Sequence, residues 1–132
     1  MTLKLSVTGD KKVLARIKRL ERELPGVTSA ACVKAAEVSA TAAKAKAPRD
    51  GGTLADSIMV QPAKLGAWVR ADAVTDDDRE YAGHVEYGTS RMPARPYLRP
   101  AVDGNKAKAS AAAGREFDRQ LDAAIRATGA TP

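Results

Sequence analysis

Alanine supplies 27 of the 132 residues of this chain, and this abundance constrains the fold more than any other feature. The hydrophobic fraction is 44%, but only 23 residues, about 17% of the chain, are Leu, Ile, Val or Phe. Sequences with less than about 20% of these four residues begin to resemble disordered chains. The net charge is only +6, so the high charge that accompanies disorder is missing. We therefore expect a single domain, residues 1–132, with Ala-rich helices, a thin core that a partner would complete, and a frayed end from about residue 128.

The sequence excludes several classes of protein. It contains no run of 18 or more apolar residues, which predicts no membrane span. The first twelve residues lack the apolar core and the cleavage site of a signal peptide. Cys32 is the single cysteine and His84 the single histidine, so an internal disulfide and the usual zinc-binding sets are excluded. We expect a protein of a reducing compartment with no metal and no other cofactor.

Charge is distributed in three blocks along the chain. Residues 1–49 carry 11 basic and 4 acidic side chains, residues 50–90 carry 3 and 8, and residues 91–132 carry 8 and 4. The blocks therefore have net charges of +7, −5 and +4. This alternation favours head-to-tail contact with copies of the same chain or with other proteins.

Apolar spacing predicts a strand and two helices in the first third of the chain. Residues 3–7 alternate apolar and polar side chains, which is typical of a strand. A helix is expected over residues 10–24, because Pro25 and a glycine follow. Thr28 or Ser29 is suited to cap a second helix that ends near residue 46, with small side chains along its apolar side.

Two strands are predicted in the middle of the chain, at residues 57–61 and 65–71, with a turn between them. The nine residues that follow, 72–80, include five acids. A calcium loop needs ligands at fixed alternating positions and a glycine at the bend, and this stretch has neither. A solvated acidic loop is therefore favoured over a cation site.

The C-terminal part is predicted to be mainly helical. A short helix or strand at residues 81–87 is closed by Gly88, and a last helix is expected over about residues 100–127, weakened by Gly104 and Gly114. The predicted fold class is α+β, with a small antiparallel sheet from the middle of the chain packed against long N- and C-terminal helices.

Catalytic chemistry has little support in the sequence. A nucleophile–base pair would have to use His84, with Ser57, Ser90 or Cys32 as the nucleophile, and no motif around these residues supports it. The paired glycines at Gly51 do not belong to a phosphate-binding loop. We therefore expect no enzymatic activity.

The basic side chains of residues 11–22 suit either nucleic-acid phosphates or solvent. The acidic residues Glu21 and Glu23 lie among and directly after these basic ones, and no aromatic side chain for base stacking lies nearby. The polar face of an amphipathic helix is the commoner explanation. A small basic nucleic-acid-binding protein is kept as the alternative function.

Large side chains are concentrated in residues 81–103. All three tyrosines and three of the seven prolines lie there. The prolines favour an extended path, and Gly88 permits a turn with positive φ. A rigid extended segment with aromatic side chains and Arg91, Arg95 and Arg99 has the composition of an interface. The same aromatic side chains are equally suited to cover the sheet, and both interpretations stay open at this point.

Two motifs in the chain resemble those of a known family. Residues 81–89 are Y-A-G-H-V-E-Y-G-T and residues 92–101 are M-P-A-R-P-Y-L-R-P-A. They are similar to the signature of a tail-component family of long-tailed bacteriophages, typified by the gene-ten product of a lambdoid phage. Upstream, residues 47–58 are A-P-R-D-G-G-T-L-A-D-S-I and resemble the family's A-P-x-D-T-G-x-L-x-x-S-I, with Gly51 where threonine is more usual. The resemblance covers about residues 10–125.

The resemblance implies a structural virion protein that acts in head–tail joining or tail completion. Such subunits form rings, commonly sixfold, between the head connector and the tail tube. The implied partners are further copies of the chain, head-completion or connector proteins, and tail-terminator or tail-tube proteins. The implied location is the neck or tail of the virion, after assembly in the cytoplasm of the host bacterium. The family pattern carries no catalytic residue, cofactor site or membrane segment.

The resemblance also selects residues for the fold and for the subunit contact. The family motif and contact positions are Tyr81, Val85, Glu86, Tyr87, Gly88, Pro93, Pro96, Tyr97, Leu98 and Pro100. The turn-motif positions are Pro48, Asp50, Gly52, Leu54, Ser57 and Ile58. One hypothesis is that Tyr97 and Leu98 anchor the subunit contact. Another is that Asp76, Asp77 and Asp78 line the lumen, through which DNA passes without specific binding.

Overall fold

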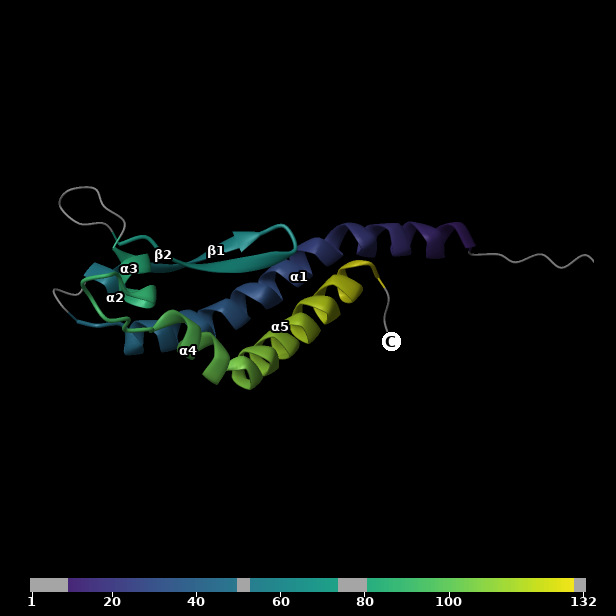
Figure 1. The fold of residues 1–132 in the computed structure, drawn as a ribbon. Helices are drawn as coiled ribbons and strands as arrows, with labels where there is room; N and C mark the ends of the chain where they lie inside the picture. Colours follow the sequence, from purple (N-terminus) through teal and green to yellow (C-terminus); the bar gives the residue numbers. More distant parts are fainter. Residues whose placement is uncertain (1–9, 50–52, 74–80, 130–132) are drawn as a thin grey trace, which may run out of the picture.

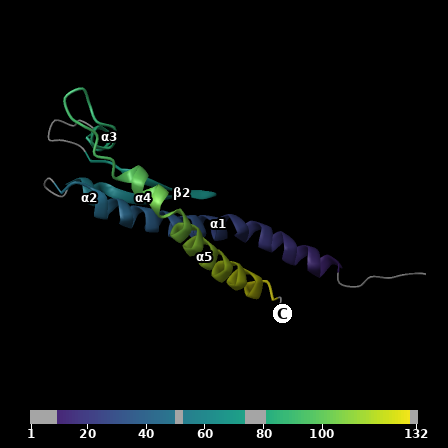
Figure 2. The same cartoon turned by 60° about the horizontal axis from the view of Figure 1, so that its bottom comes forward.

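One long helix organises the fold. The computed structural model describes residues 10–49, 53–73 and 81–129, and the predicted strand at residues 3–7 lies outside them. Helix α1 (Asp10–Lys46) runs along the whole described molecule (Figure 1). A hairpin of two strands lies on one side of α1, and the last helix runs along another side (Figures 1 and 2). This arrangement confirms the predicted α+β fold class.

The predicted break at Pro25 is wrong, because α1 continues through this proline without interruption. A proline inside a helix removes one backbone hydrogen bond and costs about 3 kcal/mol. Packing outweighs that cost here, since α1 contacts the last helix extensively and Val27 and Ala31, just after the proline, are each 5% exposed. Ser29, predicted as a cap, instead donates a hydrogen bond from its hydroxyl to the carbonyl oxygen of Ala63 at 2.8 Å.

The predicted hairpin is confirmed. Helix α2 (Thr53–Ser57) leads into strand β1 (Ile58–Ala63), and strand β2 (Gly66–Ala71) pairs antiparallel with it. The register places Ile58 opposite Ala71 and Ala63 opposite Gly66, so the turn has two residues. Both strands pack on α1, which a two-stranded sheet needs for stability.

The chain then forms three helices. Helix α3 (Ala82–Tyr87) confirms the predicted short element, and helices α4 (Leu98–Gly104) and α5 (Lys106–Ala127) divide the predicted last helix. The break falls next to Gly104, one of the two glycines expected to weaken this helix, whereas Gly114 lies inside α5. Asn105 occupies the break and donates its side-chain amide to the carbonyl oxygen of Ala101 at 2.8 Å.

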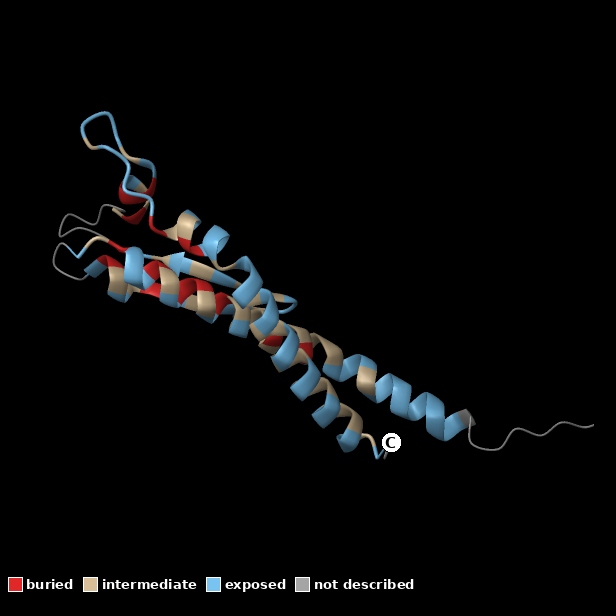
Figure 3. Cartoon of the chain, turned by 90° about the horizontal axis from the view of Figure 1, so that it is seen from below, coloured by how far each residue is buried: buried red, intermediate tan, exposed pale blue. Residues whose placement is uncertain are grey.

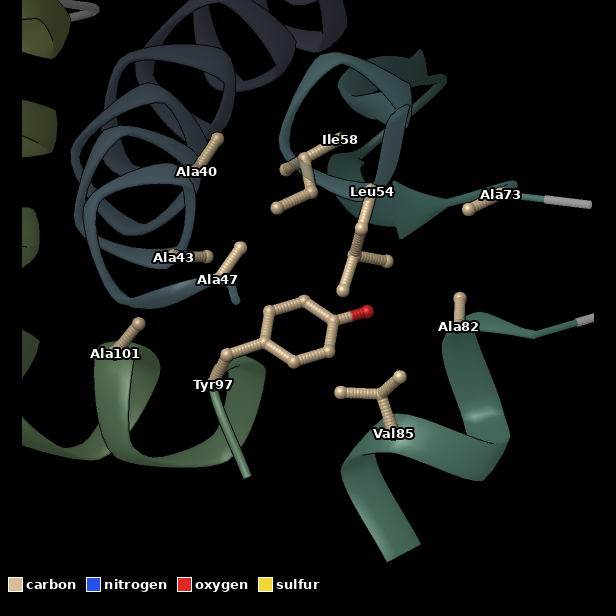
Figure 4. Close-up of a cluster of buried hydrophobic side chains, with 10 residues drawn as sticks. All are labelled: Ala40, Ala43, Ala47, Leu54, Ile58, Ala73, Ala82, Val85, Tyr97 and Ala101. Carbon is tan, nitrogen blue, oxygen red and sulfur yellow. The ribbon is translucent and has the colours of Figure 1, made fainter. Parts of the chain in front are cut away.

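The core is small and lies at one end of the molecule. Figure 3 shows buried residues along the C-terminal half of α1 and around α2 and α3, while the first turns of α1 and most of α5 are exposed. Eight of the thirteen buried hydrophobic residues in the described chain are alanines. The large side chains with almost no exposure are Tyr97, Leu54 and Ile58 (Figure 4). The prediction of a thin core is therefore confirmed for the described residues.

Candidate functional site

The family-motif residues form one structural unit, residues 81–100, which we call the motif segment. It contains α3, an exposed loop and the start of α4. Figure 3 shows the loop protruding beyond the helices at the end of the molecule that holds most of the core. The segment is thus anchored in the core at both of its ends and exposed between them.

A single carboxylate joins the two ends of the motif segment. Oε2 of Glu86 accepts the backbone N–H groups of Tyr97 at 2.8 Å and Leu98 at 2.9 Å. Oε1 accepts the backbone N–H of Arg99 at 3.0 Å and its side-chain Nε at 3.2 Å. The first N–H groups of a helix have no partner within the helix and carry partial positive charge. Glu86 therefore caps α4 from a distant position in the sequence.

The carboxyl group of Glu86 stays ionised despite its burial. Glu86 is 4% exposed, and removal from water alone would raise the pKa of its carboxyl group. The backbone N–H groups of Leu98, Arg99 and Tyr97 and the Arg99 guanidinium outweigh that effect, so the pKa of Glu86 lies below its ordinary value. The carboxylate is accordingly ionised at neutral pH.

Arg99 connects the buried carboxylate to the molecular surface. Its guanidinium carbon lies 4.8 Å from the centre of the Tyr87 ring, while its Nε donates to Glu86. A guanidinium over an aromatic face is attracted by the ring electrons. Tyr87 is 68% exposed, so this contact favours one orientation of an aromatic ring on the surface.

Gly88 starts the exposed loop with a conformation that favours glycine. Its φ is +76°, and a Cβ atom there would lie 2.7 Å from the backbone nitrogen of Ala94. The loop folds back on itself through two hydrogen bonds between Thr89 and Met92, and the N–H of Arg95 donates to the carbonyl oxygen of Val85 at 2.8 Å. The loop between α3 and α4 therefore has a defined path set by its own backbone.

The structure separates the predicted contact positions into buried and exposed groups. Tyr97 is 1% exposed and Val85 4% exposed, and Figure 4 shows the Tyr97 ring between α1, Leu54 and Val85. The hypothesis that Tyr97 anchors a subunit contact is corrected on this point, because its ring lies inside the core of its own chain. Tyr81, Gly88, Leu98 and Pro100 are half-buried, whereas Tyr87, Pro93 and Pro96 are exposed.

The turn motif serves the core. Leu54 and Ile58 are each 1% exposed, and the Ser57 hydroxyl donates to the carbonyl oxygen of Leu54 at 2.8 Å. Pro48 is half-buried. Asp50 and Gly52 lie outside the described residues, as do Asp76, Asp77 and Asp78. The motif thus joins α1 to the sheet by placing two large side chains between the Tyr97 ring, the alanines of α1 and the start of the sheet (Figure 4).

Sequence reasoning missed the apolar surface. Eight large hydrophobic residues of the described chain are exposed, and the other large ones are half-buried apart from five that are buried, namely Val27, Leu54, Ile58, Val85 and Tyr97. The exposed set is Val13, Leu14, Ile17, Met59, Leu65, Trp68, Tyr87 and Val102. Helical spacing identified Val13, Leu14 and Ile17 as part of an apolar face. The spacing does not indicate that α5 ends before it reaches these residues.

The candidate metal-binding and nucleophilic side chains of the described residues do not gather in one place. No group of three or more His, Cys, Asp or Glu side chains with metal-binding potential occurs in the described part of the chain. His84 is exposed on α3, and Cys32 is half-buried on α1. Within these same ranges, no helix has the length and apolarity needed to cross a membrane.

The model of one protein family matches residues 11–88, and the description of that family is "Bacteriophage HK97-gp10, putative tail-component". The match covers more than half of the chain. It includes the turn motif and the motif segment as far as Gly88, and it ends before Met92. No curated protein and no solved structure matches the chain.

Proposed function

The chain belongs to this family of phage tail components, and on that basis we propose that it is a ring-forming subunit that joins the phage head to the tail. The proposed ring has six copies and lies between the head connector and the tail tube. Its neighbours are head-completion or connector proteins on one side and tail-terminator or tail-tube proteins on the other. DNA passes through the lumen without specific binding.

The observation that carries this proposal is the number of large apolar side chains that a single subunit leaves exposed. Eight large hydrophobic residues of the described chain are exposed, five are buried and the others are half-buried. Monomeric soluble proteins rarely leave large apolar patches uncovered, and such patches typically mark contacts with other proteins. A subunit of a closed assembly covers them with its neighbours, which also adds the stability that a thin core lacks.

The motif segment supports the proposal independently. The Arg99 side chain, which donates to the carboxylate of Glu86, contacts the exposed ring of Tyr87 and favours one orientation of it in the single subunit. A preorganised aromatic side chain loses little conformational freedom on association. The exposed loop from Thr89 to Pro96 extends the same surface.

The oligomeric state of the purified full chain tests the proposal. Native mass spectrometry over a range of protein concentrations, with negative-stain electron microscopy, should show closed rings of one defined size. A chain that stays monomeric at every concentration, and that binds duplex DNA with an affinity falling steeply with salt, would establish the alternative of a basic nucleic-acid-binding protein.

The place of the acidic residues in such a ring remains a prediction. Asp76, Asp77 and Asp78 lie in the block of net charge −5, which would repel the phosphates of passing DNA if it faced the lumen. Replacing all three with asparagine should slow DNA ejection and leave assembly intact. Unchanged ejection kinetics in virions carrying the triple replacement would contradict the lumen assignment.

A further inference from the structure

The hairpin has one edge that is suited to accept a further strand. The N–H of Asp72 donates to the carbonyl oxygen of Ser57, so these two residues form a hydrogen-bonded pair. Hydrogen-bonded and non-hydrogen-bonded pairs alternate along two antiparallel strands. By that alternation the backbone N–H and C=O groups of Ala67, Val69 and Ala71 point away from β1. The sheet has two strands in the described chain, so these groups have no partner strand there.

The other edge of the hairpin is less suited to pairing. By the same alternation, the residues of β1 whose backbone groups point away from β2 are Ile58, Val60 and Pro62. Pro62 has no N–H to donate, and proline is one of the means by which proteins protect an edge strand from pairing. The free edge of β2 has no such protection.

An apolar groove of about 460 Å³ follows the free edge of β2. Its walls are β2, α1 and the α4–α5 junction, and no residue of β1 lines it. The lining includes Ala36 of α1, Val69 of β2, and Leu98 and Val102 of α4. A strand that pairs with β2 would therefore place one row of its side chains in an apolar environment and the other row in solvent.

The sequence contains a segment with the required pattern. In residues 3–7, Leu3, Leu5 and Val7 would share one face of a strand, and Lys4 and Ser6 the other. The three apolar side chains suit the groove, and the two polar ones suit solvent. This segment precedes α1 and lies outside the described residues.

Chain length excludes pairing of this segment with the sheet of its own chain. The hairpin turn is held at Ser29 of α1 by the 2.8 Å hydrogen bond to Ala63. The helix between Asp10 and Ser29 spans about 28 Å at 1.5 Å per residue. The seven residues from Asp10 back to Leu3 reach at most about 24 Å at 3.4 Å per residue. Figure 1 shows the start of α1 projecting well beyond the sheet.

We propose that residues 3–7 of one subunit pair with the free edge of β2 in a second copy of the chain and fill the groove beside it. The inference rests on the proposed ring, whose subunit contact it specifies. Each copy then donates a strand to one neighbour and accepts one from the other, a head-to-tail contact of the kind that closes into rings. The projecting turns of α1, with Val13, Leu14 and Ile17 exposed, connect the donated strand to its own subunit.

A pair of matched variants tests the pairing. Leu5→Asp places a charge on the face that enters the groove, and Ser6→Asp places the same charge on the opposite face. We expect Leu5→Asp to weaken self-association about tenfold or more, and Ser6→Asp to leave it unchanged. Circular dichroism spectra of both variants, compared with that of the unmodified chain, check that the subunit fold is retained.

Disulfide trapping provides the second test and uses the native thiol in the groove. Cys32 lines the groove one helical turn from Ser29, near the hairpin end of β2. With mild oxidation, Val7→Cys should form an interchain disulfide with Cys32 if the added strand is antiparallel to β2, and Leu3→Cys if it is parallel. Ser6→Cys and the double variant Val7→Cys with Cys32→Ser are the controls. The reach of the chain excludes the same bonds within one subunit.

The outcomes separate this inference from the proposed function. If the unmodified chain forms rings, equal association of the Leu5→Asp and Ser6→Asp variants, or no interchain disulfide from either Leu3→Cys or Val7→Cys, overturns the strand exchange and leaves the ring intact. If the unmodified chain remains monomeric at all concentrations, the ring itself is overturned. Selective loss of association in Leu5→Asp, together with one specific disulfide, supports the inference.

Discussion

Glu86 accepts the backbone N–H of Tyr97 at 2.8 Å, and this contact couples the exposed loop of the motif segment to the core of the subunit. The two residues are eleven positions apart, so the bond closes the loop that lies between them. The Tyr97 side chain is buried against α1 while its backbone is held by α3 through Glu86. Residues of the family motif therefore act together in fixing one tertiary contact.

Glu86→Gln should destabilise the subunit strongly. Glutamine has nearly the same shape, but its NH₂ group cannot accept the hydrogen bonds that one carboxylate oxygen accepted. The negative charge is also lost. Hydrogen bonds to a charged group contribute about 1.5–3 kcal/mol each, so we expect the free energy of unfolding to fall by about 2–4 kcal/mol. Denaturant unfolding followed by circular dichroism measures this change in the free energy of unfolding. Glu37→Gln is the control, because its ion pair with Lys34 is solvent-exposed and should change stability by less than about 1 kcal/mol.

Stability should also decline in acid because of Glu86. The pKa of its carboxyl group in the folded chain is below the ordinary value of 4.5. As the pH falls below 4.5, the unfolded chain binds the proton first, so the stabilisation present at neutral pH is progressively lost. The difference in unfolding free energy between the unmodified chain and Glu86→Gln should therefore shrink from pH 5 downwards. A difference that stays constant to the acid end of the titration would contradict this role.

Gly88→Ala should distort the start of the exposed loop. The new Cβ would lie 2.7 Å from the Ala94 nitrogen and 2.9 Å from the Met92 carbonyl oxygen, at a φ of +76°. Both neighbours are backbone atoms and cannot move aside cheaply, so we expect a loss of about 1–3 kcal/mol in unfolding free energy. Gly83→Ala is the matched control, since nothing lies within 4 Å of its added Cβ and Gly83 lies in α3, the helix that Gly88 follows. That substitution should be neutral or stabilising by up to about 1 kcal/mol.

Local sequence patterns predicted much of the fold. Alternating residues gave the hairpin, and Gly88 and Gly104 marked real helix ends because glycine acts through local backbone geometry. Pro25 was misleading, since the packing of α1 against α5 outweighs the local cost of a proline and depends on residues almost a hundred positions away. The capping role of Glu86 was equally beyond local reasoning, because its partners lie eleven to thirteen residues later in the chain.

The nature of the motif segment was only partly predictable. Its composition suited either an interface or a cover for the core, and the structure gives each role to different residues. Tyr97 is 1% exposed and Tyr87 is 68% exposed, although both lie in the same motif and have the same side chain. Composition cannot separate them, because burial depends on which side of each helix faces the core.

Tyr87→Ala should weaken ring assembly and leave the fold of the subunit intact. The ring of Tyr87 is exposed and contacts the Arg99 guanidinium, so its loss removes a surface anchor rather than core packing. Truncating an aromatic anchor in an interface typically costs about 2 kcal/mol or more, which corresponds to a decrease in association of at least about tenfold. Light scattering measures assembly, and thermal unfolding checks the fold. Assembly equal to that of the unmodified chain would remove Tyr87 from the contact.

Tyr97→Phe should make the subunit less sensitive to alkali. Burial, followed by the negative charge of Glu86 and the neighbouring Tyr81, raises the pKa of the Tyr97 phenol from 10.0 to about 12. Above pH 10 the unfolded chain therefore loses the proton first, and the unmodified chain should lose about 1–3 kcal/mol of unfolding free energy as the pH approaches 12. Phenylalanine fills the same cavity and has no proton to lose, so this decline should be absent from the variant. All other residues are identical in the two chains, so their contributions cancel in the comparison. Parallel stability curves for the two chains between pH 9 and pH 12 would show that the buried phenol does not set the alkaline limit of the fold.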